Sequence, residues 1–287
     1  MSVSVISLNN GRLQDGPLPS DEYNRLPHVD DMRDVASQNA KAHAILLGMI
    51  AAEGLADKFS LHLIHKHFDV PVGRVMVYET IKGKDHSDFV LCSPRVPEKY
   101  PNMRGLYFKA VAGGNMVAYE YTTEPGADLS THSDFVERFA EKSLELGAQD
   151  VFALTAIPIC APNRLLTEFE MANVLSTISL SDASWLPGYK RGNATPTDWN
   201  ASEDYAKYAD GSVPGIIQLQ CIKEKDDCHY QFDCSTTRSG RHIGHAGDPF
   251  SGETPQEIVH SINGEPLQEG TEGFAVVTHA LQLIEAA

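Results

Sequence analysis

The sequence predicts an α+β fold, in which a mostly antiparallel sheet built from hairpins is flanked by a few amphipathic helices. Three observations predict it. Extended runs come in pairs joined by short turns that contain Gly or Pro, apolar residues recur at helical spacing near both ends of the chain, and strands and helices do not alternate regularly. Regular alternation would instead predict a parallel, doubly wound sheet.

Three helices are predicted from apolar periodicity. The first follows Asp30 and Asp31, which can cap it, and ends at Gly54. Its apolar stripe contains Met32, Val35, Ala36, Leu46, Met49 and Ile50. A second amphipathic helix is predicted around residues 135–146, and a third closes the chain over residues 271–285.

Three hairpins are predicted as well. The first pairs residues 59–68 with 74–81, the second pairs 105–111 with 115–122, and the third pairs 215–223 with 228–236. Further strands are expected at residues 88–92 and 150–157, whereas residues 168–180 fit a helix or a strand.

The domain organisation is predicted as an extended, Pro-punctuated arm over residues 1–29 and a single α+β domain over residues 30–287. Residues 184–212 are polar, contain both tryptophans (Trp185 and Trp199), and are expected to form a long irregular excursion. A second lobe that begins at about residue 184 is the alternative.

Composition excludes several classes of protein. The 287-residue chain has a formal net charge of −16, which argues against nucleic acid and anionic membrane surfaces as partners. No apolar run approaches the ~20 residues needed to cross a bilayer. The five cysteines are few and odd in number, and the N-terminus lacks the features of a secretory or mitochondrial signal. A cytoplasmic location is therefore expected, while the oligomeric state stays open.

Several common motifs are missing from the sequence. It has no P-loop and no Gly-x-Gly-x-x-Gly, so no nucleotide cofactor is expected. It also has no Gly-x-Ser-x-Gly elbow, no His-Glu-x-x-His and no Cys-x-x-Cys pair. These absences argue against α/β-hydrolases, the common zinc peptidases and thioredoxin-like enzymes.

The first predicted hairpin carries the leading candidate site. Residues two apart on a strand point to the same face, so His65 and His67 are expected to project side by side. Glu79 on the returning strand would complete a two-His-one-carboxylate set for one divalent ion, zinc, iron or manganese. These three residues are therefore the candidate metal ligands and catalytic residues.

Two other interpretations of the histidines stay open. They can serve in acid–base chemistry or in hydrogen bonds to a ligand. They can also be structural, because Leu61 and Leu63 share their predicted face and most buried histidines are satisfied by hydrogen bonds. If the segment were helical, His62 and His65 would share a face instead.

The run Leu63-Ile64-His65-Lys66-His67-Phe68 resembles a Leu-His-Arg/Lys-His-Phe signature of uncharacterised fungal proteins. The resemblance covers roughly residues 59–80. It implies a fungal source and no particular activity.

A second candidate site lies in the Gly-rich, basic stretch over residues 235–247, which is expected to be a loop. Arg238, Arg241, His242 and His245 are expected to bind a carboxylate or phosphate group of a small substrate. The alternative is a surface loop whose arginines pair with the protein's own carboxylates. Cys160 is a further candidate, as a thiol nucleophile or as an inert core residue.

Together these features predict an enzyme that acts on a small, anionic organic molecule through a histidine-centred site, with one divalent metal ion as the candidate cofactor. Lyase, isomerase, hydrolase and oxygenase chemistry all stay open. The competing prediction is a non-catalytic module that binds a small molecule or a protein partner and in which the histidines are structural.

Overall fold

The structure is a computed structural model that describes residues 17–157, 166–171, 174–180, 194–212, 235–244, 260–262, 265–266 and 268–286. The α-helices are α1 (Ser20–Tyr23), α2 (Val35–Gln38), α3 (Ala40–Ala52), α4 (Ser133–Glu145) and α5 (Glu272–Glu285). The strands are β1 (Phe59–Leu63), β2 (Val75–Ile81), β3 (Phe89–Arg95), β4 (Arg104–Val111), β5 (Asn115–Thr122), β6 (Phe152–Ala156), β7 (Thr167–Met171), β8 (Ser176–Leu180), β9 (Ala194–Pro196), β10 (Asp198–Asn200), β11 (Ser235–Gly244), β12 (His260–Ile262) and β13 (Glu265–Pro266).

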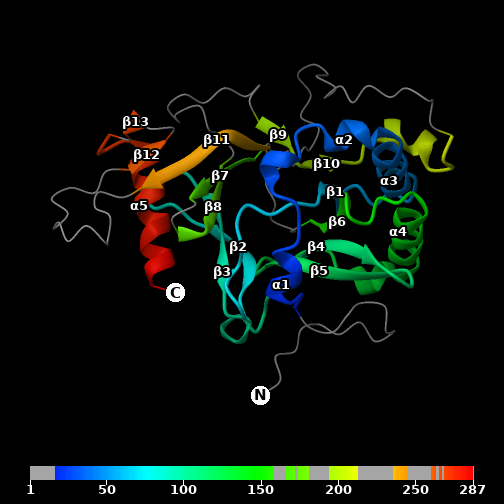
Figure 1. The fold of residues 1–287 in the computed structure, drawn as a ribbon, viewed down its shortest axis with the longest axis horizontal. Helices are drawn as coiled ribbons and strands as arrows, with labels where there is room; N and C mark the ends of the chain where they lie inside the picture. Colours follow the sequence, from blue (N-terminus) through cyan, green and yellow to red (C-terminus); the bar gives the residue numbers. More distant parts are fainter. Residues whose placement is uncertain are drawn as a thin grey trace.

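The described strands join into one sheet in the order β10-β1-β6-β4-β5-β2-β3-β8-β7-β11-β12-β13, with β9 also beside β11. The pairs β2–β5 and β7–β11 are parallel, and the other described pairs are antiparallel. Helices α3 and α4 lie at one end of this sheet and α5 at the other (Figure 1). The predicted α+β class with a mostly antiparallel sheet is therefore confirmed.

One face of the sheet carries the main apolar core beneath α3 and α4. The alternate residues Phe59, Leu61 and Leu63 of β1 join Phe152 and Leu154 of β6 in this core. Fully burying one such side chain contributes about 1.5–3 kcal/mol. The intervening residues of β1 and β6 therefore point to the opposite face, where the polar side chains of the candidate site lie.

Close packing on α3 depends on Gly48. A Cβ atom at this position would lie 2.6 Å from the carbonyl oxygen of Tyr205, in the 3-10 helix Glu203–Tyr208. No side chain fits there, so glycine allows that turn to rest directly on the helix.

The predicted first helix is interrupted. Residues 35–38 and 40–52 are helical, but Asn39 between them has φ −110° and ψ 27°, and its side-chain amide donates to the carbonyl of Val35 at 2.8 Å. Asparagine competes with the helix backbone in this way, which explains the break. Gly54, at φ 67°, follows the helix end as predicted.

The second predicted hairpin is confirmed, because β4 and β5 pair antiparallel across Gly113 and Gly114. The prediction of the first hairpin is wrong, because its two strands are not neighbours. Strand β1 lies between β10 and β6, whereas β2 lies between β5 and β3. Strand β1 ends at Leu63, and the following residues instead bond to the segment that precedes α2. Apart from Ser235 and Thr236 in β11, the third predicted hairpin lies outside the described residues.

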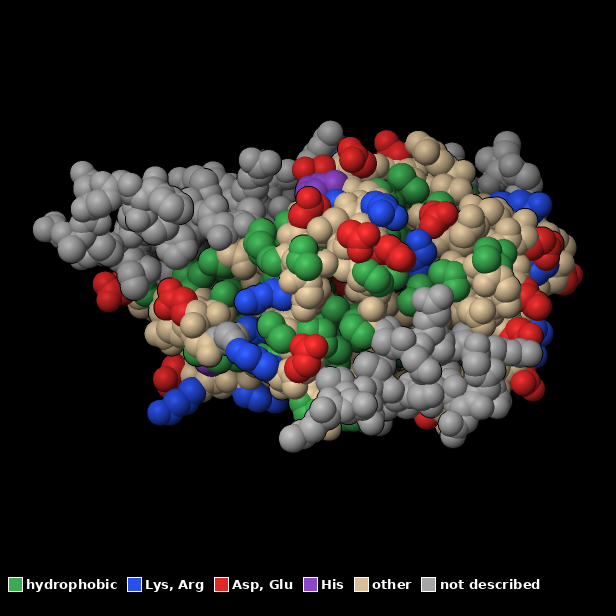
Figure 2. Space-filling view, turned by 60° about the horizontal axis from the view of Figure 1, so that its bottom comes forward, with side chains coloured by type: hydrophobic (Ala, Val, Ile, Leu, Met, Phe, Trp, Pro, Cys, Tyr) green, Lys and Arg blue, Asp and Glu red, His purple; other side chains and the backbone are tan. Residues whose placement is uncertain are grey.

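The described part of the predicted arm, residues 17–29, lies on the body with Leu18, Tyr23, Leu26 and Val29 buried, and includes helix α1. The predicted excursion at 184–212 is not irregular throughout, since β9 and β10 lie within it. Among the described residues, no helix combines the length and apolar character of a membrane span. On the face in Figure 2, acidic and basic side chains are interspersed.

Candidate metal centre

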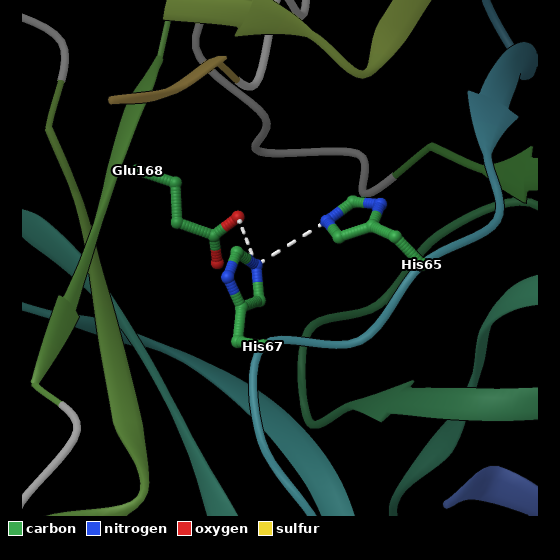
Figure 3. A group of neighbouring side chains, drawn as sticks. All are labelled: His65, His67 and Glu168. Atoms are coloured by element: carbon green, nitrogen blue, oxygen red, sulfur yellow. Dashed lines mark hydrogen bonds and ion pairs between the residues drawn. The ribbon is translucent and has the colours of Figure 1, made fainter. Parts of the chain in front are cut away.

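Three buried side chains converge where the segment after β1 passes strand β7. The Nε2 atoms of His65 and His67 lie 3.3 Å apart, and His67 Nε2 lies 3.1 Å from Oε2 of Glu168. All three ligand atoms lie within 4.8 Å of one another, and the side chains point toward a common centre (Figure 3). Each residue is less than 10% exposed, with His65 at 4%, His67 at 6% and Glu168 at 1%.

The backbone fixes the state of His65. Its Nδ1 lies 2.7 Å from the carbonyl oxygen of Leu63, and a carbonyl oxygen can only accept a hydrogen bond, so Nδ1 carries the proton. Burial, followed by the neighbouring His67 and His62, lowers the pKa of His65 well below 6.5. The ring is therefore neutral, and the lone pair of Nε2 faces His67 and Glu168, as in metal-binding histidines that donate their other N–H to a carbonyl.

A strap, residues 17–29, holds the segment that carries both histidines. Lys66, which lies between them, donates its N–H to the carbonyl of Pro27 at 2.8 Å and accepts from the N–H of Val29 at 2.9 Å. His28 donates from Nε2 to the carbonyl oxygen of His67 at 2.6 Å. These bonds place both imidazoles without any pairing to β2.

Glu168 reaches the centre from strand β7. Its Oε1 accepts a hydrogen bond from the hydroxyl of Thr177 on the neighbouring strand β8. This leaves Oε2 facing His67. The hydrogen bond from Thr177 on β8 thus orients the carboxylate of Glu168, and the position of Glu168 on β7 places that carboxylate beside His67.

His62 extends the cluster along the polar face of β1. Its ring stacks on Tyr107 with centroids 3.8 Å apart and lies 5.1 Å from the ring of His65. Burial lowers the pKa of His62 to about 3, so this ring is neutral as well.

Two buried carboxyls flank the histidines. Glu120 on β5 accepts hydrogen bonds from Tyr23 at 2.7 Å and Tyr78 at 2.9 Å, and burial raises its pKa to about 7 against the effect of these bonds. The charge of Glu168 also raises the pKa of Glu120. Burial raises the pKa of Asp198, on β10, to about 8.

Glu79, the predicted third ligand, is not part of this cluster. Its Oε2 forms an ion pair with Nη2 of Arg95 at 3.0 Å, across the antiparallel pair β2–β3. The prediction assumed that β1 and β2 are neighbours, and they are not. Glu168 takes the position that Glu79 was expected to fill.

The predicted basic loop is largely a strand. Arg238, Arg241 and His242 belong to β11, which runs parallel to β7 with Thr236 opposite Glu168. The basic stretch therefore runs alongside β7, the strand that carries the candidate metal ligand Glu168. His245, Cys160, Trp185 and the predicted hairpin around residues 224–227 lie outside the described residues.

The sequence interpretation missed Glu168, Glu120 and Asp198. Glu168 lies 101 residues from His67, in a stretch whose apolar pattern fits helix or strand. The sequence showed only a single carboxylate, Glu168, within a stretch that folds as a buried strand. Such a pattern does not indicate which residue the carboxylate contacts. No protein-family model, curated protein or solved structure matches the chain, so the centre is interpreted from its own residues.

Proposed function

We propose that the protein binds one divalent metal ion, zinc, iron or manganese, through Nε2 of His65, Nε2 of His67 and a carboxylate oxygen of Glu168. We further propose that it is an enzyme that acts on a small, anionic organic molecule at this ion. Lyase, isomerase, hydrolase and oxygenase chemistry are all compatible with such a ligand set.

The separation of the three ligand atoms carries the proposal. Zinc–nitrogen bonds of about 2.0–2.1 Å place tetrahedral ligand atoms about 3.3 Å apart. The two closest pairs in the cluster are 3.3 Å and 3.1 Å apart, so one ion can bridge them with little rearrangement. The neutral tautomer of His65 supports the same interpretation, since a lone pair on Nε2 is what a metal requires.

The proposed metal ligands and the neighbouring buried carboxyls would have different roles in the reaction. A bound ion would supply a Lewis acid with positions open to water or substrate, because three protein ligands leave coordination sites free. Glu120 and Asp198, with pKa values of about 7 and 8, are suited to hold or release a proton near neutral pH. Tyr23 and Tyr78 orient Glu120 for this role.

An anionic substrate group is assigned to the basic strand. Arginine binds carboxylates and phosphates through two parallel hydrogen bonds. The register of β11 on β7 supports this role for Arg238, Arg241 and His242, since it puts the basic stretch alongside Glu168.

A purely structural role is the second candidate, and the closed hydrogen-bond network favours it. Thr177, Glu168, His67 and the Leu63 carbonyl can satisfy one another without an ion. Elemental analysis of untagged protein tests the choice, beside a His65→Ala/His67→Ala variant and a Glu168→Gln variant. Loss of one equivalent of zinc, iron or manganese in folded variants supports the metal centre. Equal metal content in parent and folded variants contradicts it.

A metal-loaded parent then justifies a substrate screen with small carboxylates and phosphate esters. Turnover that requires the ion and falls in Arg241→Ala supports the proposed substrate class. Turnover of neutral compounds that is unchanged in Arg241→Ala contradicts it.

A further inference from the structure

A second group of buried polar side chains lies next to the candidate centre and shares no ligand atom with it. In the antiparallel pair β1–β10, Ser60 faces Asn200 and His62 faces Asp198. Residues directly opposite each other, and residues two apart, lie on the same face of a sheet. All four side chains therefore gather on the polar face, while Leu61 and Trp199 turn toward the apolar core.

Two polar atoms of this group have no hydrogen-bond partner among the residues that the structure describes. They are Nδ1 of His62 and Oδ1 of Asn200, each inaccessible to solvent. His62 and Asp198 are 2% and 1% exposed as residues. Buried polar atoms of a native protein are nearly always paired, so two neighbouring exceptions indicate a missing partner.

Asp198 also has no cationic side chain beside it. Within the described part of the chain, neither Lys nor Arg forms an ion pair with this carboxylate. Hydrogen bonds from the hydroxyls of Ser60 and Thr155 and from the backbone N–H of Trp199 lower the pKa of Asp198 against the larger effect of burial, and Thr155 donates to Oδ2 at 3.1 Å. Burial raises the pKa of Asp198 to about 8, so the carboxyl holds a proton at neutral pH, and a bound cation would take the place of that proton.

The geometry points to a second divalent cation held by Nδ1 of His62, the carboxylate of Asp198 and Oδ1 of Asn200, with the hydroxyl of Ser60 alongside. Nδ1 of His62 lies 3.4 Å from Oδ2 of Asp198, close to the about 3.3 Å between neighbouring tetrahedral ligands of a zinc-sized ion. Oδ1 of Asn200 is an acceptor, and neutral His62 offers a lone pair on Nδ1 when its proton is on Nε2, as a cation requires.

The donor set selects the type of ion. Imidazole suits zinc, iron, copper and nickel, whereas carboxylate and amide oxygens also suit manganese and magnesium. A set of one imidazole and several oxygens therefore fits a divalent transition ion such as Mn²⁺ better than Ca²⁺, which takes six to eight oxygens. The stacking of His62 on His65 makes this site a close neighbour of the first, although its ligands are its own.

Counting bound Mn²⁺ by equilibrium dialysis and electron paramagnetic resonance tests the inference on the full chain. The parent is expected to bind two Mn²⁺ ions, and folded Asp198→Asn is expected to bind one. Asn200→Ala keeps the first site and weakens the second at least tenfold; this residue is partly exposed on the edge strand, so the variant is expected to fold. Asp57→Asn, at an exposed carboxylate that forms an ion pair with its neighbour Lys58, is the charge-matched control and keeps both ions.

The two proposals fail separately in this experiment. One ion that is lost in Asp198→Asn and kept in His65→Ala/His67→Ala supports the second site alone. One ion lost only in the His65/His67 variant, or unchanged binding in Asp198→Asn and Asn200→Ala, overturns the second site. A parent that binds no Mn²⁺ at millimolar concentration overturns it as well.

Discussion

Replacement of Glu168 by Gln separates a metal ligand from a structural hydrogen bond. Gln has nearly the same shape, and its amide oxygen can still accept from Thr177. Glu168 is 1% exposed, so removal of its charge also removes a desolvation penalty. In the absence of metal, the melting temperature of Glu168→Gln is therefore expected to lie within about 2 °C of the parent value, equivalent to less than about 1 kcal/mol.

The expected difference appears when metal is added. A ligand that binds only the folded state stabilises it by about 2.7 kcal/mol at 100 times its dissociation constant. For a chain of this size, 1 kcal/mol corresponds to roughly 2–4 °C, so the parent is expected to gain about 5–10 °C. Loss of an outer-shell partner alone weakens metal binding about 10–100-fold, and loss of a ligand is expected to weaken it at least 100-fold. At the same metal concentration the variant then gains only about 0.4 kcal/mol, or about 1 °C.

Thermal unfolding of chelator-treated protein, followed by circular dichroism with and without Zn²⁺ or Mn²⁺, measures both quantities. His86→Ala controls for metal binding elsewhere, because His86 and His279 form a part-buried imidazole pair with nitrogens 3.0 Å apart that contains none of the proposed ligands. A metal-induced rise of the same size in the parent and in Glu168→Gln would refute the assignment of Glu168 as a ligand. A rise that disappears in His86→Ala would place the metal at the His86–His279 pair.

Three further variants test the surroundings of the centre. His28→Ala removes the bond to the His67 carbonyl and is expected to weaken metal binding about tenfold without unfolding the protein, as shown by a metal titration. Glu120→Gln tests the raised pKa of Glu120, which is about 7 in the folded protein and 4.5 in the unfolded chain. Because the folded pKa is the higher one, the contribution of Glu120 to the unfolding free energy is complete below pH 4.5 and is lost as the pH rises to 7. The unfolding free energy of Glu120→Gln relative to the parent should thus increase by up to about 1.4 kcal/mol per pH unit over that window, and a difference independent of pH would contradict the assignment. His43→Leu is expected to stabilise the protein by about 1–3 kcal/mol at neutral pH, because both ring nitrogens are buried without hydrogen-bond partners among the described residues. Since burial lowers the pKa of His43 from 6.5 to about 3, the stability of the parent falls as the pH drops below 6.5, and the benefit of Leu should grow in that direction in denaturant titrations.

Local patterns predicted the fold where a local cause decides the structure. The turn at Gly113 and Gly114 and the helix end at Gly54 follow from backbone conformations that glycine adopts readily. The amphipathic stripe of Phe135, Val136 and Phe139 likewise yields α4 over the core. In each case the residues that determine the element lie within it.

Strand partners could not be predicted in the same way. Period-two alternation identifies a strand and its two faces, but it says nothing about which strand lies alongside. The alternation across residues 59–68 predicted a hairpin, whereas Lys66 bonds to Pro27 and Val29, some 40 residues earlier in the chain.

The candidate site likewise has a part that local sequence could predict and a part that depends on the order of the strands. His65 and His67 were found because their spacing is local. Their carboxylate partner depends on the order of β8 and β7 at the far side of the sheet, where Glu168 pairs with Thr177. The same order of strands keeps Glu79 out of the metal centre, and Glu79 forms an ion pair with Arg95 on the adjacent strand.

Diffraction from crystals grown with Mn²⁺ or Zn²⁺, recorded at the absorption edge of the metal, tests the central claim most directly. We expect an anomalous difference peak between Nε2 of His65, Nε2 of His67 and Oε2 of Glu168, within about 2.0–2.2 Å of each for zinc. The peak should be missing from crystals of Glu168→Gln. Full metal occupancy elsewhere in the molecule, with no peak between these three side chains, would contradict the claim.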